Sequence, residues 1–284
     1  MTRTTSSKTA RTTARKEVFE TPSFSSRVKS MLSLDFYRLF NTPLFYIMLL
    51  IAAIIPAMVL SMAGVDMQVP DAAGAAYGTG VGGMPQSTLE LTNAWQMIES
   101  TGGSAAGANP LDFGGYANIN MLFIFAGLLM AIFVAHDYSS GFVKNIFAVH
   151  SKKIDYVISK TAIGVFSGAA MIITYLFGTV LAGLLTGKAF DVDVMGLVFC
   201  LVSKMLLMGV FCSLFLSIAV FFRNKLWLTI VFTFLFGMML YPAASIATLN
   251  STILIVFISL GVGVLGALGF GAISLLFLKK RDLA

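Results

Sequence analysis

Charged side chains are scarce in this sequence of 284 residues: 11% are Asp, Glu, Lys or Arg, whereas a typical soluble domain has about 25%. Hydrophobic residues make up 57% of the chain, which is more than a water-soluble surface can accommodate. Several uncharged stretches are as long as the roughly 18 to 20 residues that cross a bilayer. These features exclude an ordinary soluble domain and predict an all-α integral membrane protein.

Cysteine, histidine and intramembrane acids are also rare. Cys200 and Cys212 lie in one apolar segment about three helical turns apart, too far for a disulfide within a helix, and we expect both to be buried. His136 and His150 share one polar segment, where we expect surface positions, and no predicted span contains an acid. The sequence therefore predicts a chain that is not an enzyme and disfavours proton-coupled transport, although a sodium site built from carbonyl groups stays open.

The phosphate loop of nucleotide-binding proteins is missing as well. The nearest segment, 183–189, is one residue short of that motif and has Ala189 where a Ser or Thr would hold magnesium. We therefore expect this chain to bind no cofactor of its own.

Six stretches are long and apolar enough to be membrane spans within one transmembrane domain, 42–284. As a single helix, residues 226–278 would be roughly 80 Å long. No bilayer is that thick, so we expect the chain to turn between 241 and 251. The spans are predicted at 44–64, 117–135, 161–185, 196–222, 226–240 and 252–278.

The segments outside the spans differ in composition. Residues 1–23 are rich in Thr, Ser and Arg and predict a disordered cytosolic tail, with an organelle transit peptide as the alternative. Residues 24–41 have apolar side chains at helical spacing and predict an amphipathic helix in the membrane interface. Residues 65–116 lack Lys and Arg and predict an outer loop, with a short helix resting on the outer membrane surface through Trp95.

Lys and Arg are distributed unevenly. Of the 19 in the chain, only Lys188 and Lys204 lie outside if both ends are cytoplasmic. The positive-inside rule therefore predicts a multi-pass protein of the plasma membrane with cytoplasmic termini, whose basic pI reflects topology and attraction to lipid, with no nucleic-acid partner. Because Lys204 lies within an apolar stretch, we expect it to snorkel to the outer headgroups, or alternatively to line a substrate path.

Small residues recur in the last predicted span at intervals of four. They predict close helix packing, against either another span or another protomer. These residues are Ser259, Gly263, Ala267 and Gly271.

A polar segment follows the second predicted span. Gly141 permits a sharp turn there, and the apolar side chains after it have helical spacing, which predicts a short helix parallel to the membrane. A loop lying against lipid is the alternative. The candidate docking residues of this segment are Asp137, Tyr138, Gly141, Phe142, Val143, Lys144, Asn145, Ile146 and Phe147.

This segment, with its run from Asp137 to Phe142, resembles the cytosolic signature of ABC transporter permeases of the type-two exporter class. The order of the elements over 24–283 is similar too, and the chain looks most like permeases that work with bacteriocin, lantibiotic or bacitracin resistance ATPases. The resemblance implies a coupling helix that docks on a separate ATPase holding ATP and magnesium, a second permease chain, identical or related, and export of an amphipathic or hydrophobic peptide, antibiotic or lipid. An ATP-independent channel or ion-coupled carrier and a non-transporting scaffold remain alternatives.

Overall fold

The computed structural model describes residues 23–62, 93–98, 118–148, 152–223 and 225–280. Most of the predicted tail and of the predicted outer loop lies outside the described residues. Within them the regular elements are helices, and β pairing is limited to an isolated bridge between Asn93 and Ala189.

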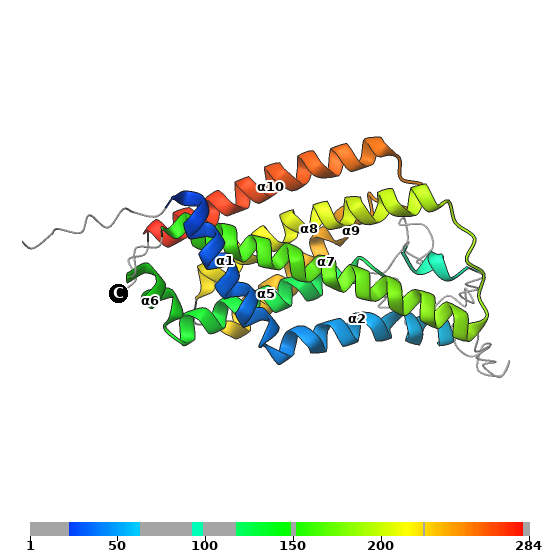
Figure 1. Cartoon of the computed structure of the whole chain (residues 1–284), viewed down its shortest axis with the longest axis horizontal. Helices are drawn as coiled ribbons and strands as arrows, with labels where there is room; N and C mark the ends of the chain where they lie inside the picture. Colours follow the sequence, from blue (N-terminus) through cyan, green and yellow to red (C-terminus); the bar gives the residue numbers. More distant parts are fainter. Residues whose placement is uncertain (1–22, 63–92, 99–117, 149–151, 224, 281–284) are drawn as a thin grey trace, which may run out of the picture.

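The described residues include six helices that are long and apolar enough to cross a membrane. They lie side by side along the length of the molecule (Figure 1). The prediction of an all-α membrane protein with six spans is therefore confirmed. The helices are α2 (Pro43–Met62), α5 (Met121–Ser139), α7 (Lys153–Thr186), α8 (Val194–Phe222), α9 (Leu226–Ala244) and α10 (Ile253–Lys280).

The helices differ from the predicted spans mainly at their ends. α7 begins at Lys153 rather than at 161, and α5 continues to Ser139 rather than ending at 135. Both extensions carry charged side chains, which were predicted to lie in a cytosolic segment. α9 runs to Ala244 instead of 240, with Pro242 in its final turns.

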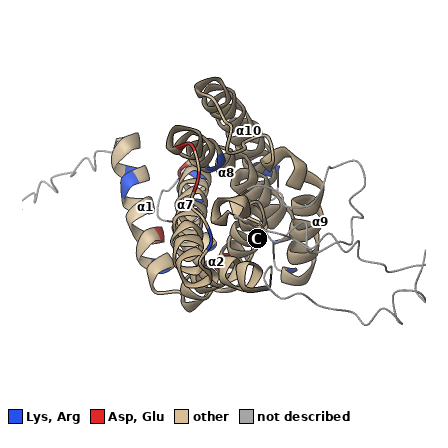
Figure 2. Ribbon diagram, turned by 90° about the vertical axis from the view of Figure 1, so that its right-hand side faces the viewer, with Lys and Arg blue, Asp and Glu red and all other residues tan. Residues whose placement is uncertain are grey.

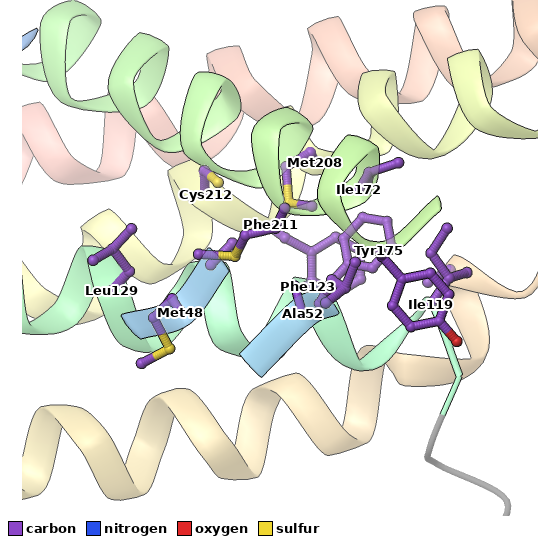
Figure 3. Close-up of a cluster of buried hydrophobic side chains, with 14 of the residues drawn as sticks. Met48, Ala52, Ile119, Phe123, Leu129, Ile172, Tyr175, Met208, Phe211 and Cys212 are labelled. Atoms are coloured by element: carbon purple, nitrogen blue, oxygen red, sulfur yellow. The ribbon is translucent and has the colours of Figure 1, made fainter. Parts of the chain in front are cut away.

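The core lies around α8, which packs against α5, α7, α9 and α10. Aromatic rings and methionines of α2, α5, α7 and α8 fill the space between those four helices (Figure 3), and the ring centroids of Phe123 and Phe211 are 4.6 Å apart. Cys200 and Cys212 are free thiols buried in the bundle, as expected. Many of the large exposed apolar side chains lie on α2, α9 and α10, as is typical of surfaces that face lipid.

The small residues of α10 face other helices of the same chain. A Cβ atom on Gly263 would lie 2.7 Å from the backbone oxygen of Leu206 in α8, so the two backbones approach more closely than a larger side chain would allow. Ser259 and Gly271 are also buried, and Ala267 is partly buried. Of the two options left open by the sequence, the structure shows packing against another span.

The segment around Trp95 corrects the prediction of a helix resting on the outer membrane surface. Residues Ala94–Ile98 form a short 3₁₀ helix, η1, whose Ala94, Met97 and Ile98 are buried against the bundle. The hydroxyl of Tyr175 in α7 donates a hydrogen bond to the Met97 carbonyl at 2.9 Å. This buried hydrogen bond and apolar packing hold η1 to the spans.

Candidate functional site

The amphipathic helix α1 (Phe24–Phe40) lies against α7 at one side of the bundle (Figure 2). It begins after Ser23, whose hydroxyl accepts a hydrogen bond from the Ser26 amide. Its inward face contains Met31, Asp35 and Leu39 at intervals of four, and all three are buried. A carboxylate therefore lies in the middle of the apolar face, where it needs a partner of opposite charge.

Lys160 of α7 is that partner. Its Nζ lies 2.6 Å from Asp35 Oδ1 and 2.7 Å from Asp137 Oδ2 of α5, and all three side chains are fully buried. Ser159 donates a further hydrogen bond, at 2.6 Å, to the second carboxylate oxygen of Asp35. One lysine thus joins α1, α5 and α7.

Arg38 of α1 completes this group. Its guanidinium makes an ion pair with Asp137 at 2.5 Å and approaches Asp35 at 3.8 Å. The hydroxyl of Tyr156 donates a hydrogen bond to Asp137 at 3.2 Å. The four charged residues Asp35, Arg38, Asp137 and Lys160, here called the ion cluster, contain two acids and two bases, so their formal charges cancel.

Burial makes the ion cluster sensitive to the loss of any member. Desolvation costs several kcal/mol per ion, and this cost is offset only while the opposite charges remain in contact. Outside the ion cluster, the ion pair between Arg27 and Asp155, at 2.9 Å, connects the first part of α1 to the first turn of α7. We therefore infer that these ion pairs restrict the movement of α1 relative to α7.

The short helix α6 (Phe142–Ala148) lies at the same end of the bundle as α1 (Figure 1). Gly141 has a φ of 71°, in the left-handed region, and this lets the chain turn sharply from α5 into α6. The ring centroid of Phe142 lies 3.8 Å from the guanidinium carbon of Arg38, so Phe142 makes a cation–π contact with the ion cluster.

The two sides of α6 have different surroundings. Val143 is buried in an apolar cluster with residues of α5, α7, α8 and α10, and Phe142, Ile146 and Phe147 pack against that cluster as partly buried side chains. The rings of Phe147 and Tyr156 lie 5.8 Å apart between their centroids. Lys144 and Asn145 are exposed. Of the candidate docking residues, the apolar ones therefore hold α6 to the bundle, whereas these two polar ones are open to a partner.

The remaining candidate docking residues lie at the end of α5. Asp137 belongs to the ion cluster, and Tyr138 is half-buried, with the guanidinium carbon of Arg223 5.9 Å from its ring centroid. The structure thus brings the predicted segment together with Arg38 and Lys160, whose roles the sequence did not reveal.

Lys204 lies at the opposite end of the bundle, near η1, and corrects the expectation that it snorkels to the headgroups. Its side chain is fully buried. The Nζ donates hydrogen bonds to Asn120 Oδ1 at 2.6 Å and to the Ala244 carbonyl at 3.0 Å. Acceptors inside the protein replace water around the ammonium, so it has no need to reach the membrane surface.

Asp35, Arg38 and Lys160 were missed because they were counted as ordinary cytosolic charges. A signal for Asp35 was present: it stands between Met31 and Leu39 on one helical face, where an exposed residue would not be expected. For Asp137 and Lys160 the signal was weaker, because their burial depends on how far α5 and α7 continue beyond the apolar stretches.

No family model, curated protein or solved structure matches this chain. Its function is therefore inferred from the arrangement of its own residues.

Proposed function

We propose that this chain is the membrane subunit of an ATP-driven exporter of the ABC type, and that a separate ATPase docks on the exposed side of α6. The observation that carries the proposal is α6 itself, a short helix held at one end of a six-span bundle with Phe142 stacked on a buried ion cluster. A surface helix of this kind can receive force from a soluble partner and pass it to the spans.

The ion cluster provides the mechanical connection in this proposal. Movement of α6 displaces Phe142 and therefore Arg38, which is paired with Asp137 of α5. Asp137 in turn is paired with Lys160 of α7. Because separating buried opposite charges is costly, α1, α5 and α7 move together rather than one by one.

The remaining features of the proposal follow from the resemblance noted in the sequence. ATP and magnesium are held by the partner ATPase, and a second permease chain completes the working unit in the plasma membrane, with both termini cytoplasmic. The cargo is an amphipathic or hydrophobic peptide, antibiotic or lipid, as in exporters that confer resistance to antimicrobial compounds. Largely apolar spans suit such cargo better than a multiply charged solute.

Docking is tested by reversing a charge on the exposed side of α6. The full chain is purified from its own host cells, and the ATPase that co-purifies is quantified. Lys144→Glu is expected to lower ATPase recovery about tenfold, because an exposed interface contact becomes repulsive. Lys188→Glu makes the same change away from α6 and is expected to leave recovery unchanged. Failure of the unmodified chain to retain an ATPase, or full retention by Lys144→Glu, contradicts the proposal.

Force transmission needs a separate test, because Phe142 contacts the bundle rather than the exposed side of α6. Phe142→Ala is expected to leave ATPase recovery near the unmodified level while substrate efflux per ATP hydrolysed falls. Efflux is measured in inverted vesicles that contain both proteins. Unchanged efflux per ATP hydrolysed in Phe142→Ala would show that the contact between Phe142 and Arg38 does not couple α6 to the spans.

An ATP-independent channel or ion-coupled carrier is the second candidate, and the polar cavity beside Lys204 favours it. The purified chain alone, in liposomes with only an ion or substrate gradient, distinguishes the two. Gradient-driven transport without an ATPase supports the carrier, whereas transport only with ATPase and ATP supports the exporter.

A further inference from the structure

A cavity of about 260 Å³ lies at the η1 end, between α5, α8 and the turn that joins α9 to α10. Lys204 and Asn120 form its buried floor, and Thr248 and Asn250 form an exposed rim. The half-buried Ser245 lies between floor and rim. Most of the lining residues are therefore polar, Ile98 and Ala247 being the apolar ones, and the exposed rim opens at the end of the bundle.

A chain of hydrogen bonds connects Lys204 to this cavity. The ammonium donates to Asn120 Oδ1 at 2.6 Å, and the Nδ2 of the same amide donates to Ser245 Oγ at 3.2 Å. Since Ser245 Oγ already accepts a hydrogen bond, its own hydrogen is available to be donated. Each bond in the chain polarises the next, so the lysine charge strengthens the Ser245 hydroxyl as a donor.

The wall of the cavity is fixed before any ligand arrives. The Cys200 thiol contacts the Ala247 carbonyl at 3.5 Å, and the Thr248 amide donates to Ser251 Oγ at 3.0 Å. A Cβ atom on Gly196 of α8 would overlap the Leu249 carbonyl, so glycine allows the turn to lie directly on α8. A preformed wall lowers the cost of ordering side chains on binding.

The donors identify the class of ligand. Ser245, Thr248 and Asn250, whose side chains carry hydroxyl or amide groups, line a cavity that Lys204 also lines. Oxygen atoms of a phosphate or carboxylate accept hydrogen bonds from such groups. The volume is below the roughly 300 to 1,000 Å³ of pockets for drug-sized ligands, so it suits a headgroup or small ion rather than a whole cargo molecule.

We propose that this cavity binds an oxyanion, a phosphate or carboxylate group, supplied either by a lipid headgroup or by a soluble anion. Ser245 and the rim residues contact the oxyanion, and Lys204 acts through Asn120. The proposal does not depend on a partner ATPase, because binding is a property of this chain alone.

The test uses the purified full chain in detergent and measures bound phosphatidylglycerol by native mass spectrometry and inorganic phosphate by calorimetry. Ser245→Ala is expected to weaken binding about tenfold, which is the usual effect of losing one hydrogen bond to a charged group. Lys204→Met removes the charge behind Asn120 and is expected to weaken binding by a smaller factor, because it acts through the hydrogen-bond chain. Binding of phosphatidylglycerol but not of phosphate identifies a lipid headgroup. Binding of phosphate alone identifies a soluble anion.

Two controls keep the test specific. Lys188→Met removes another positive charge, and Ser203→Ala removes a buried hydroxyl that makes no hydrogen bond; both are expected to bind as the unmodified chain does. If Lys204→Met fails to fold, the binding measured for Ser245→Ala alone tests the proposed site. Any of three results overturns the proposal. Ser245→Ala binds as tightly as the unmodified chain, phosphatidylcholine binds as tightly as phosphatidylglycerol, or neither phosphatidylglycerol nor phosphate binds.

Discussion

At the α6 end of the bundle, Lys160 lies within 2.7 Å of two aspartates, whereas at the η1 end Lys204 donates to an amide oxygen and a backbone carbonyl. The ion cluster combines charges from α1, α5 and α7. The hydrogen bonds of Lys204 lead instead into a cavity. Buried ion pairs thus connect helices at one end, and a lysine that donates to Asn120 and to the Ala244 carbonyl lines a cavity at the other.

This difference predicts where substitutions are tolerated. In the ion cluster every member compensates another, so removing one leaves a buried charge of opposite sign. In the cavity the groups nearest to solvent are neutral, and water can replace a lost hydrogen bond. Substitutions should therefore affect stability mainly at the α6 end and ligand binding mainly at the η1 end.

The largest expected effect is that of Asp137→Ala, which leaves Arg38 and Lys160 with one carboxylate between them. We expect the free energy of unfolding to fall by about 3 to 5 kcal/mol. Unfolding in mixed detergent micelles can be followed by labelling of the buried thiols of Cys200 and Cys212. The neighbouring exposed residue supplies the control, His136→Ala, with an expected change within about 0.5 kcal/mol. A similar change for both variants would show that the ion cluster does not stabilise the bundle.

Ser159→Ala should have the next largest effect. It removes the hydroxyl that donates to buried Asp35 at 2.6 Å, and a hydrogen bond to a charged group contributes about 1.5 to 3 kcal/mol. The same unfolding measurement applies. Ser203→Ala is the control, because that buried hydroxyl has no hydrogen-bond partner among the described residues and its removal should be nearly neutral. A loss for Ser203→Ala as large as for Ser159→Ala would argue against a special role for Asp35.

Phe142→Leu separates the cation–π contact from apolar packing at the α6 end. Leucine retains most of the apolar contact but offers no ring to Arg38, and we expect a loss of about 1 kcal/mol in the free energy of unfolding. Ile146→Leu, a change of equal volume on the same helix, should have less effect. Identical free energies of unfolding for Phe142→Leu and the unmodified chain would show that the contact between Phe142 and Arg38 does not stabilise the bundle.

Ser245→Ala should have the smallest effect on stability. This serine is half-buried and its hydroxyl bonds to a neutral amide, so we expect a loss of about 0.5 kcal/mol. Because the chemical change is the same as in Ser159→Ala, the pair compares the two ends directly in one unfolding assay. If Ser245→Ala lowers the free energy of unfolding as much as Ser159→Ala does, the α6 end is no more sensitive to the loss of a hydrogen bond than the η1 end.

The spans could be predicted because the length of an apolar stretch is a local property of the sequence. The turn after α9 and the short helix after Gly141 were expected for the same reason, since proline, glycine and helical spacing mark them. The ion cluster could not be predicted in full: Asp35 and Lys160 are 125 residues apart, and no local pattern pairs them. The burial of Lys204 likewise depends on Asn120 and Ala244, which belong to other helices.

The long sequence separation of Asp35 and Lys160 also sets an order for synthesis of the protein. While the ribosome extends the chain through α2 and α5, Lys160 has not yet been made, so Asp35 lacks the lysine that it contacts in the folded bundle. The contacts of α1 with α7 form only after the first turns of α7 have emerged. Insertion of the early spans therefore precedes the full attachment of α1, and a nascent chain cut before Lys153 would lack every contact between α1 and α7 while retaining both partners of the Arg38–Asp137 ion pair.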